Sequence, residues 1–423
     1  MAEDESLGRR LGRLAAMARI ATRALPVDTN PVPRSWTHVT KVDPEDRKRL
    51  PLLYPRVLQY TDAVAVGGST GVTVANTEAT FALLSAVDRP AFHEPSDPAH
   101  VTDRTREAAA FIAIPQVLNG DTEAFVGDLG TGIERVRQQL APAMVDEHVP
   151  SWTPGVVRDV LADLGTSWLL ETAVFEAYLV QNPDSAAAHE AGVTADDVLS
   201  PGDAARRATV ADRYLHAPVV YVEYSGAFGG RAAERVLEAV DGTVSGPRVW
   251  YGGGLRSRAD ARAVLDAGAD AVVVGDAFHD VATEESALFG RARDSLGEEA
   301  SRIGVASRTD VSEWLTDEVE VGETAAAAYL STVPTLPNPE EVARSLLVDT
   351  LTVWLRLRAL TEESSGTPPE SALDRSVAVG EHHAGIDGEA SRRWARAALG
   401  AVAGGPTDPL AAQLSPAAAG EGP

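Results

Sequence analysis

Apolar and polar positions follow a strand-like pattern through one long part of the chain. Between residues 37 and 277, short β-rich runs bounded by turn residues are separated by Ala-, Arg- and Glu-rich segments with helical periodicity. The eight runs are THVTKVD (37–43), DAVAVGG (62–68), PAFHEPS (90–96), AFIAIPQVLN (110–119), AVFEAYLVQN (173–182), VVYVEYSG (219–226), RVWYGGGL (248–255) and DAVVVGDA (270–277). Eight buried strands alternating with helices over roughly 250 residues predict a (β/α)8 barrel. An open doubly wound sheet is the alternative, but it does not require eight strands.

Two segments depart from a regular barrel. The third crossover, residues 97–109, contains Pro98 and is short for a full helix. We therefore expect one layer of the barrel wall to be missing there. Residues 128–165 are longer than a crossover needs and contain two helical patterns, so they are predicted to form an insertion that serves as a lid or a contact surface.

An arginine-rich segment precedes the barrel. Within residues 1–33, the stretch SLGRRLGRLAAMARIATRAL (6–25) has the periodicity of an amphipathic helix. Its arginines interrupt the apolar core that a signal peptide needs. Two interpretations stay open: a helix packed on the barrel with a solvated basic face, or a helix in weak contact with a membrane surface.

The pattern changes again after the barrel, which we expect to span residues 34–290. Residues 291–364 are predicted to be a helical extension, and its clearest helix opens with an Asn-Pro-Glu-Glu cap and has one apolar side that must be buried. Pro, Gly, Ala and Ser dominate residues 365–423, which predicts a low-order tail. We expect His382 and His383 in this tail to be exposed rather than bound to a metal.

Charge and composition narrow the classes of function. The formal net charge is -25, and only two of the 37 basic residues are lysines, Lys41 and Lys48. So acidic a chain suits a salt-adapted protein and argues against nucleic acid as a partner. It contains no cysteine, which fits a cytoplasmic location. No apolar run approaches the ~18 residues of a membrane span, so we expect at most peripheral membrane contact.

Polar residues gather where the predicted strands end, which is where barrel enzymes place their sites. Lys41 and Asp43 end the first strand and point to the same side. Glu223 interrupts the otherwise apolar sixth strand, and burial of a lone carboxylate is costly unless it is paired or functional. Here Glu223 is placed to hold a hydroxyl and accept its proton, and Asp43 to hold Mg²⁺.

Glycines follow the last two strands. The seventh strand ends in Gly252-Gly253-Gly254 and the eighth in Gly275-Asp276, each leading into a helix. Backbone amides at such helix N-termini bind phosphate where no side chain obstructs them. The sequence therefore predicts a phosphorylated ligand. The Gly-Gly-Ser turn after the second strand is weaker evidence because such turns are common.

The chain resembles the geranylgeranylglyceryl phosphate synthase family, which includes heptaprenylglyceryl phosphate synthases. The resemblance covers roughly residues 34–285 and rests on five motifs in order. They are WTHVTKVDP (36–44), TDAVAVGGSTGVT (61–73), AYLVQNPDSAAA (177–188), VYVEYSGAFGG (220–230) and YGGGLRSRADARAVLDAGADAVVVGD (251–276). It implies a modified (β/α)8 barrel with a defective third helix.

The resemblance also implies a reaction and the residues that perform it. The enzyme would join sn-glycerol 1-phosphate to a polyprenyl diphosphate with Mg²⁺, forming the first ether bond of archaeal-type lipids. By motif, Asp43 and Ser69 would bind the metal. Glycerol 1-phosphate would be bound by Lys41, Tyr221, Val222, Glu223, Tyr224, Ser225, Gly226, Gly254, Gly275 and Asp276. Glu223 would orient the C3 hydroxyl and take its proton, and Tyr178 and Tyr221 would line the path of the prenyl chain, although ordinary strand packing also explains Tyr178.

Several alternatives remain at the level of the sequence. The insertion at 128–165 falls near the region where the family measures prenyl length, so the donor is not readable there. We expect the C20 geranylgeranyl donor because acidic composition and ether lipids together suggest an archaeon; a C35 heptaprenyl donor is the alternative. A different phosphate-binding barrel enzyme, such as a sugar-phosphate isomerase, and an inactive barrel that acts as a binding protein are the rival functions. We also expect a homo-oligomer.

Overall fold

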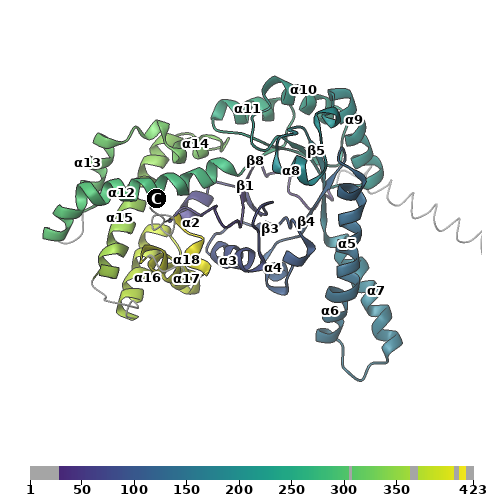
Figure 1. The fold of residues 1–423 in the computed structure, drawn as a ribbon, viewed down its shortest axis with the longest axis horizontal. Coiled ribbons are helices and arrows are strands. Elements are labelled where there is room, and N and C mark those ends of the chain that lie inside the picture. Colours follow the sequence, from purple (N-terminus) through teal and green to yellow (C-terminus); the bar gives the residue numbers. More distant parts are fainter. Residues whose placement is uncertain (1–27, 304–306, 363–369, 404–408, 416–423) are drawn as a thin grey trace, which may run out of the picture.

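The computed structural model describes residues 28–303, 307–362, 370–403 and 409–415, and these form a parallel barrel with helical additions on two sides (Figure 1). The sheet has eight strands in the order β3-β2-β1-β8-β7-β6-β5-β4. The strands are β1 (His38–Val42), β2 (Ala63–Val66), β3 (Ala91–His93), β4 (Ala113–Val117), β5 (Val174–Val180), β6 (Val219–Glu223), β7 (Arg248–Gly252) and β8 (Ala271–Val274). Each lies within one of the eight predicted runs, so the barrel prediction is confirmed.

The barrel is nearly closed, with a gap between β3 and β4. A single isolated bridge, His93 to Ile112, joins these two strands. The crossover between them contains η1 (Pro98–His100) and α4 (Asp103–Ala108), a helix of six residues. The predicted weak layer of the wall is therefore real, although a short helix fills part of it.

Alternation along the strands separates two apolar layers. Inward side chains such as Tyr178, Tyr221 and Trp250 form the filling of the barrel. Outward side chains such as Leu179 and Val222 pack against the surrounding helices. These helices are α2 (Tyr54–Leu58), α3 (Val74–Leu84), α8 (Ala186–Glu190), α9 (Pro201–Val210), α10 (Gly230–Asp241), α11 (Arg258–Asp266) and α12 (Asp276–Ile303), with the short 3-10 helix η4 (Ala195–Asp197) and the π-helical segment η5 (Ala211–Leu215).

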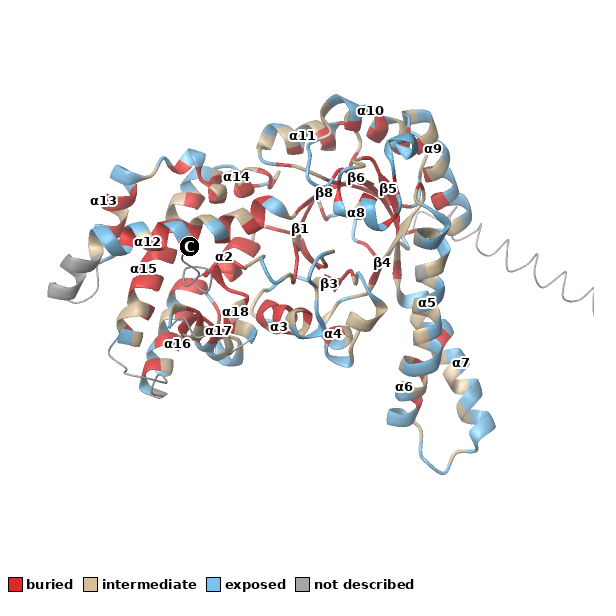
Figure 2. Ribbon diagram, in the orientation of Figure 1, coloured by how far each residue is buried: buried red, intermediate tan, exposed pale blue. Residues whose placement is uncertain are grey.

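The predicted insertion is a helical hairpin that projects from the barrel between β4 and β5 (Figure 1). Its first arm comprises η2 (Glu123–Gly127), α5 (Asp128–Arg135), η3 (Val136–Leu140) and α6 (Ala141–His148), and its second arm is α7 (Gly155–Thr172). The hairpin is thus longer than the 128–165 range expected. Figure 2 shows much of the outer face of α7 exposed, and this face includes the apolar residues Val156, Val160, Leu164 and Trp168.

The C-terminal part is a packed helical unit. It comprises α13 (Arg308–Glu318), η6 (Val321–Glu323), α14 (Ala325–Ser331), α15 (Pro339–Glu362), α16 (Glu370–Ala384), α17 (Gly388–Val402) and α18 (Pro409–Ala412). These helices contact α2, α3 and α12 of the barrel. The expected boundary near residue 290 is not a break, because α12 continues to Ile303.

The prediction of a low-order tail from residue 365 was wrong for the described part of that segment. Trp394 is fully buried and its indole Nε1 donates to the carbonyl of Leu52 at 3.0 Å. The small residues that suggested disorder allow close packing instead: a Cβ at Gly380 would lie 2.6 Å from the Trp394 ring. Leu414 forms an isolated bridge with Leu50 in the segment before α2.

The expectation of two exposed histidines was also half wrong. His382 is exposed, but His383 is buried and its Nδ1 lies 3.4 Å from Oδ1 of Asp349. Arg308 and Arg56 bind the same carboxylate, and the Arg56 contact joins the helical unit to the barrel. The predicted helix at 6–25 lies outside the described residues. Among the helices that the structure describes, none is long and apolar enough to cross a membrane.

Candidate active site

A cavity of about 830 Å³ opens at the carboxyl ends of the strands. It brings together almost all of the residues singled out from the sequence. The predicted residues that line it are Lys41, Asp43, Ser69, Tyr178, Tyr221, Glu223, Ser225, Gly226, Gly254, Gly275 and Asp276. Residues from six of the eight strand ends therefore meet where the barrel architecture places a site.

Val222 and Tyr224 are the two predicted residues whose side chains do not line the cavity. Both point outward, as the alternation along β6 requires. Val222 is fully buried between strand and helices, and the Tyr224 ring packs 5.8 Å from that of Tyr251. Only the backbone groups of these two residues are therefore placed to contact a ligand in the cavity.

Lys41 belongs to a buried network across the mouth. Its Nζ donates to Oε1 of Glu94 at 2.9 Å, and the hydroxyl of Tyr178 donates to the same oxygen at 2.7 Å. Burial alone would lower the pKa of Lys41, but the carboxylates of Glu94 and Asp43 raise it, so the ammonium stays charged. The sequence analysis missed Glu94, although a carboxylate ending the third strand repeats the placement of Asp43.

The two carboxylate oxygens of Glu223 differ in their hydrogen bonding. Its side chain is 2 % exposed, and its Oε1 accepts the backbone N–H of Ser225 at 2.8 Å. Oε2 has no hydrogen-bond partner among the described residues. Burial raises the pKa of this carboxyl group. An unpartnered oxygen on a carboxylate that lines a cavity is suited to hold a substrate hydroxyl and accept its proton.

The ring of Tyr178, which belongs to the Lys41 network, stacks on the ring of Tyr221. The centroids of Tyr178 and Tyr221 are 4.4 Å apart and their planes differ by 1°. Only glycine fits beside them, because a Cβ at Gly252 would lie 1.9 Å from the Tyr221 hydroxyl oxygen. The tyrosines present a rigid aromatic surface to the cavity.

The glycine turns leave room for an anion. Gly253 and Gly254 have φ values of +149° and +52°, and a Cβ at Gly254 would lie 2.3 Å from the backbone nitrogen of Phe228. Gly275 directly precedes the N-terminus of α12. Open amides at a helix N-terminus favour phosphate. The arrangement agrees with the predicted phosphate site.

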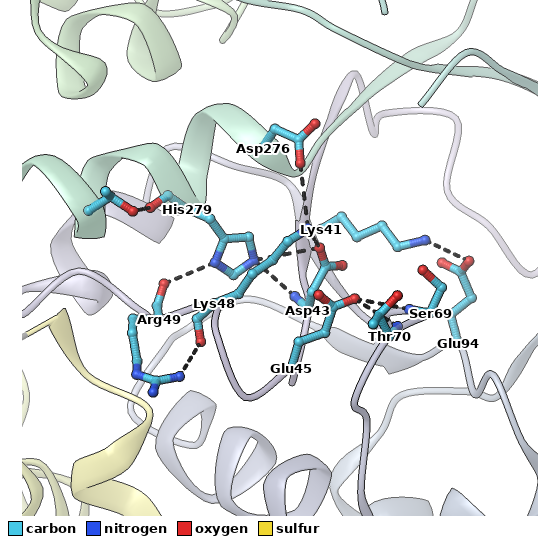
Figure 3. Close-up of polar contacts among 11 residues, drawn as sticks. Lys41, Asp43, Glu45, Lys48, Arg49, Ser69, Thr70, Glu94, Asp276 and His279 are labelled. Carbon is cyan, nitrogen blue, oxygen red and sulfur yellow. Dashed lines mark hydrogen bonds and ion pairs between the residues drawn. The ribbon is translucent and has the colours of Figure 1, made fainter. Parts of the chain in front are cut away.

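Asp43 is held by groups that the sequence analysis did not assign (Figure 3). Its backbone N–H donates to Nε2 of His279 at 3.0 Å, and Nδ1 of His279 lies 2.9 Å from the carbonyl of Arg49. Burial lowers the pKa of His279, which keeps the ring neutral with its proton on Nδ1. Lys48 binds Oδ2 of Asp43 and lies 3.5 Å from Oδ1 of Asp276. The sequence feature that could have identified Lys48 is that it is one of only two lysines in the chain.

The donors near Asp43 suit Mg²⁺ only together with a ligand. Among the described residues, no three His, Asp or Glu side chains cluster as a metal site. Asp43 offers a carboxylate and Ser69 a hydroxyl, and the intervening Gly68 is so close to Asp43 that a Cβ there would lie 3.1 Å from its Cβ. Mg²⁺ commonly uses one or two carboxylates plus substrate phosphates and water. This sparse set fits a metal that arrives with a diphosphate.

A second, apolar arm of the cavity runs along the hairpin. It is lined from β4 by Ile114 and Val117, and from the hairpin by Phe125, Leu129, Ile133, Val136, Leu140, Leu169 and Leu170. The insertion is thus a wall of the cavity rather than a separate surface. A phosphate-binding end and a long apolar arm within one cavity suit a ligand with a charged head and a hydrocarbon chain.

The barrel part of the chain is similar in sequence to proteins of one family. A model described as the PcrB family matches residues 33–289. The geranylgeranylglyceryl phosphate synthase of Methanoculleus marisnigri is 33% identical over 248 residues, covering 58% of this chain and 92% of that protein. The enzyme of the same name from Halobacterium salinarum is 33% identical over 250 residues, covering 59% and 90%. A heptaprenylglyceryl phosphate synthase of Listeria monocytogenes is 28% identical over 245 residues, covering 57% and 92%.

One solved structure is similar over part of the chain. The structure of (S)-3-O-geranylgeranylglyceryl phosphate synthase from Thermoplasma acidophilum in complex with sn-glycerol-1-phosphate is 23% identical, with a TM-score of 0.42, and covers 58% of this chain and 86% of that chain.

Proposed function

The chain belongs to the PcrB family, and from this premise we propose that it is a prenyltransferase that joins sn-glycerol 1-phosphate to a long prenyl diphosphate. The observation that carries the proposal is that Glu223, whose buried Oε2 has no partner among the described residues, lines a cavity with a glycine-rich end and an apolar arm. A substrate hydroxyl, an anionic group and a hydrocarbon chain each have a complementary surface there.

In the proposed reaction, the C3 hydroxyl oxygen of glycerol 1-phosphate bonds to the allylic carbon of the donor. The bond between that carbon and the diphosphate oxygen breaks, and the hydroxyl proton passes to Oε2 of Glu223. Lys41 and the turns at Gly254 and Gly275 would hold the glycerol phosphate, which fixes the hydroxyl for attack. The faces of Tyr178 and Tyr221 would stabilise positive charge on the allylic carbon.

Mg²⁺, when bound, would neutralise the charge of the leaving diphosphate. Asp43 and Ser69 are the residues proposed to hold it.

For the donor we propose the C20 geranylgeranyl diphosphate. The relatives at 33% identity carry geranylgeranyl in their names, and the acidic composition resembles that of salt-adapted proteins. The C35 donor named for the relative at 28% identity is the alternative.

The direct test is an assay in high salt with glycerol 1-phosphate, Mg²⁺ and prenyl diphosphates of several lengths. Ether product and released diphosphate are both measured. We expect product with the C20 donor and none after chelation of the metal. Absence of product with every donor would refute the transferase proposal, and preference for C35 over C20 would refute the choice of donor.

A further inference from the structure

The loop between β1 and α2 brings two charged side chains, Glu45 and Lys48, to the cavity. Lys48 binds Oδ2 of Asp43 and lies 3.5 Å from Oδ1 of Asp276. Glu45, three residues earlier, accepts the backbone N–H groups of Ser69 and Thr70 through Oε1, each at 3.1 Å (Figure 3). One loop thus supplies a cation to the carboxylates and an anion to the amides.

Lys48 and Glu45 each bind protein groups that are suited to hold part of the proposed ligand, a divalent cation with a diphosphate. Asp43 and Ser69 are the residues proposed to hold a divalent cation. Successive backbone N–H groups such as those of Ser69 and Thr70 form an anion-binding concavity. Lys48 and Glu45 also line the cavity, so a ligand that enters it meets both side chains.

The backbone of the loop is fixed while its charged side chains remain at the cavity. The His279 ring accepts the N–H of Asp43 at Nε2 and donates to the carbonyl of Arg49 from Nδ1. One buried imidazole therefore ties both ends of the loop segment 43–49. Glu45 and Lys48 can change partners by rotation of their side chains, without movement of the loop ends.

The choice of lysine is informative in this chain. Only two of 37 basic residues are lysines, and both line this cavity. An ammonium is a compact point charge, whereas a guanidinium is a planar fork that binds a carboxylate through two hydrogen bonds. A lysine is therefore the better substitute for a small metal ion and the easier one to displace.

We propose that Lys48 and Glu45 are an internal substitute for the metal diphosphate: Lys48 occupies Asp43 until the divalent cation arrives and then binds the diphosphate, while Glu45 vacates the amides of Ser69 and Thr70 for a diphosphate oxygen. The proposal rests on the proposed function for the identity of the ligand. It adds two binding residues, and it makes Lys48 a competitor of the metal and a partner of the diphosphate.

The first test measures Mn²⁺ binding to the full chain without any prenyl donor, at constant ionic strength, by the electron paramagnetic resonance signal of free Mn²⁺. We expect Lys48→Met to bind Mn²⁺ about tenfold more tightly than wild type, because a competing charge is gone. Lys48→Arg should bind it more weakly than wild type. The control Arg47→Met removes an equal charge from an exposed position in the same loop and should change affinity less than about twofold.

The second test measures binding of inorganic pyrophosphate at saturating Mn²⁺. Here Lys48→Met should bind about tenfold more weakly than wild type, with Arg47→Met again unchanged. Glu45→Ala should bind pyrophosphate more tightly, and Glu45→Gln should be intermediate because the amide is a weaker acceptor. Thermal unfolding of each variant verifies that the loop change has not unfolded the chain.

The proposal predicts that Lys48→Met changes the two affinities in opposite directions, with tighter Mn²⁺ binding and weaker pyrophosphate binding. Lys48→Met with unchanged or weaker Mn²⁺ affinity would overturn the competition, and unchanged pyrophosphate affinity would overturn the transfer of Lys48 to the diphosphate. Unchanged pyrophosphate binding by Glu45→Ala would remove Glu45 from the scheme. Neither measurement needs prenyl transfer. A chain with the expected binding but no ether product would refute the proposed reaction and leave the role of the loop intact.

Discussion

Carboxylates at the mouth of the barrel differ in what binds them. Glu94 accepts from Lys41 and Tyr178, and Asp43 is bound by Lys48. Glu223 keeps one buried oxygen without a partner among the described residues. Because of this asymmetry Glu223 has an unpartnered oxygen that can accept a proton, whereas oxygens of Glu94 and Asp43 are already bound by Lys41 and Lys48.

Glu223→Gln should lower turnover by about a hundredfold or more while glycerol phosphate binding changes little, since the amide keeps the shape but accepts no proton. Burial raises the pKa of Glu223 above its ordinary value of 4.5, and the base works only when ionised. The kcat/KM of the wild type should therefore fall as pH is lowered through that raised pKa. A pH profile of both proteins measures this. Near-normal turnover of Glu223→Gln with the same acid limb would contradict the role.

Gly252→Ala should disturb the tyrosine pair, because the new Cβ would lie 1.9 Å from the Tyr221 hydroxyl oxygen. We expect a loss of about 1–3 kcal/mol in the free energy of unfolding, together with reduced kcat. The control is Gly290→Ala in α12, where a Cβ would meet nothing within 4 Å. Urea unfolding of both variants is the measurement, and equal stabilities would show that the ring moves aside without cost.

At the scale of elements, helix α7 of the hairpin has two faces with different surroundings. Leu169 and Leu170 of α7 line the apolar arm, whereas Leu164 on its outer face is 60 % exposed. Helical periodicity separates these faces within two turns. The length of the insertion was visible in the sequence, but its role as a cavity wall depends on how the hairpin folds back beside β4.

Leu169→Trp should fill part of the apolar arm and lower kcat/KM for prenyl donors by about tenfold or more, with a larger loss for longer chains. Leu164→Trp is the matched control, because it adds the same ring to the exposed face of α7. Steady-state kinetics with donors of several lengths measure the effect, with the KM for glycerol phosphate expected to stay constant. Equal kinetics of the two variants would place the prenyl chain elsewhere.

At the scale of the whole molecule, the C-terminal helices are part of the folded body that supports the site. Asp349 of α15 binds Arg56 of the barrel, and Trp394 of α17 packs on the segment before α2. The same segment carries the loop with Lys48. We therefore expect the loss of these contacts to lower the stability of the folded body as a whole.

Trp394→Ala should cost about 3–5 kcal/mol in the free energy of unfolding, since it removes a fully buried indole and its hydrogen bond to Leu52. Trp152→Ala is the control, because that ring is 82 % exposed at the tip of the hairpin and its loss should change stability by less than about 0.5 kcal/mol. Chemical denaturation at constant salt compares the two. A small effect at Trp394 would show that the extension unfolds independently of the barrel.

The sequence by itself determined the barrel, the strand ends and the predicted site residues there, of which all but Val222 and Tyr224 line the cavity. Inward and outward positions follow from the two-residue period of a strand, and the site lies at the strand ends in any such barrel. Lys41, Asp43 and Glu223 were found for this reason. The oligomeric state and the cytoplasmic location stay predictions.

Only the tertiary structure decided which side chains contact one another at the site. Glu94 meets Lys41 from a distance of 53 residues along the chain, and His279 reaches Asp43 from 236 residues away. The many small residues of α16 and α17 led to a prediction of disorder, because the composition of a segment does not show what the segment packs against. Local periods set which way a side chain points, but the contact it makes there depends on segments that only the folded chain brings together.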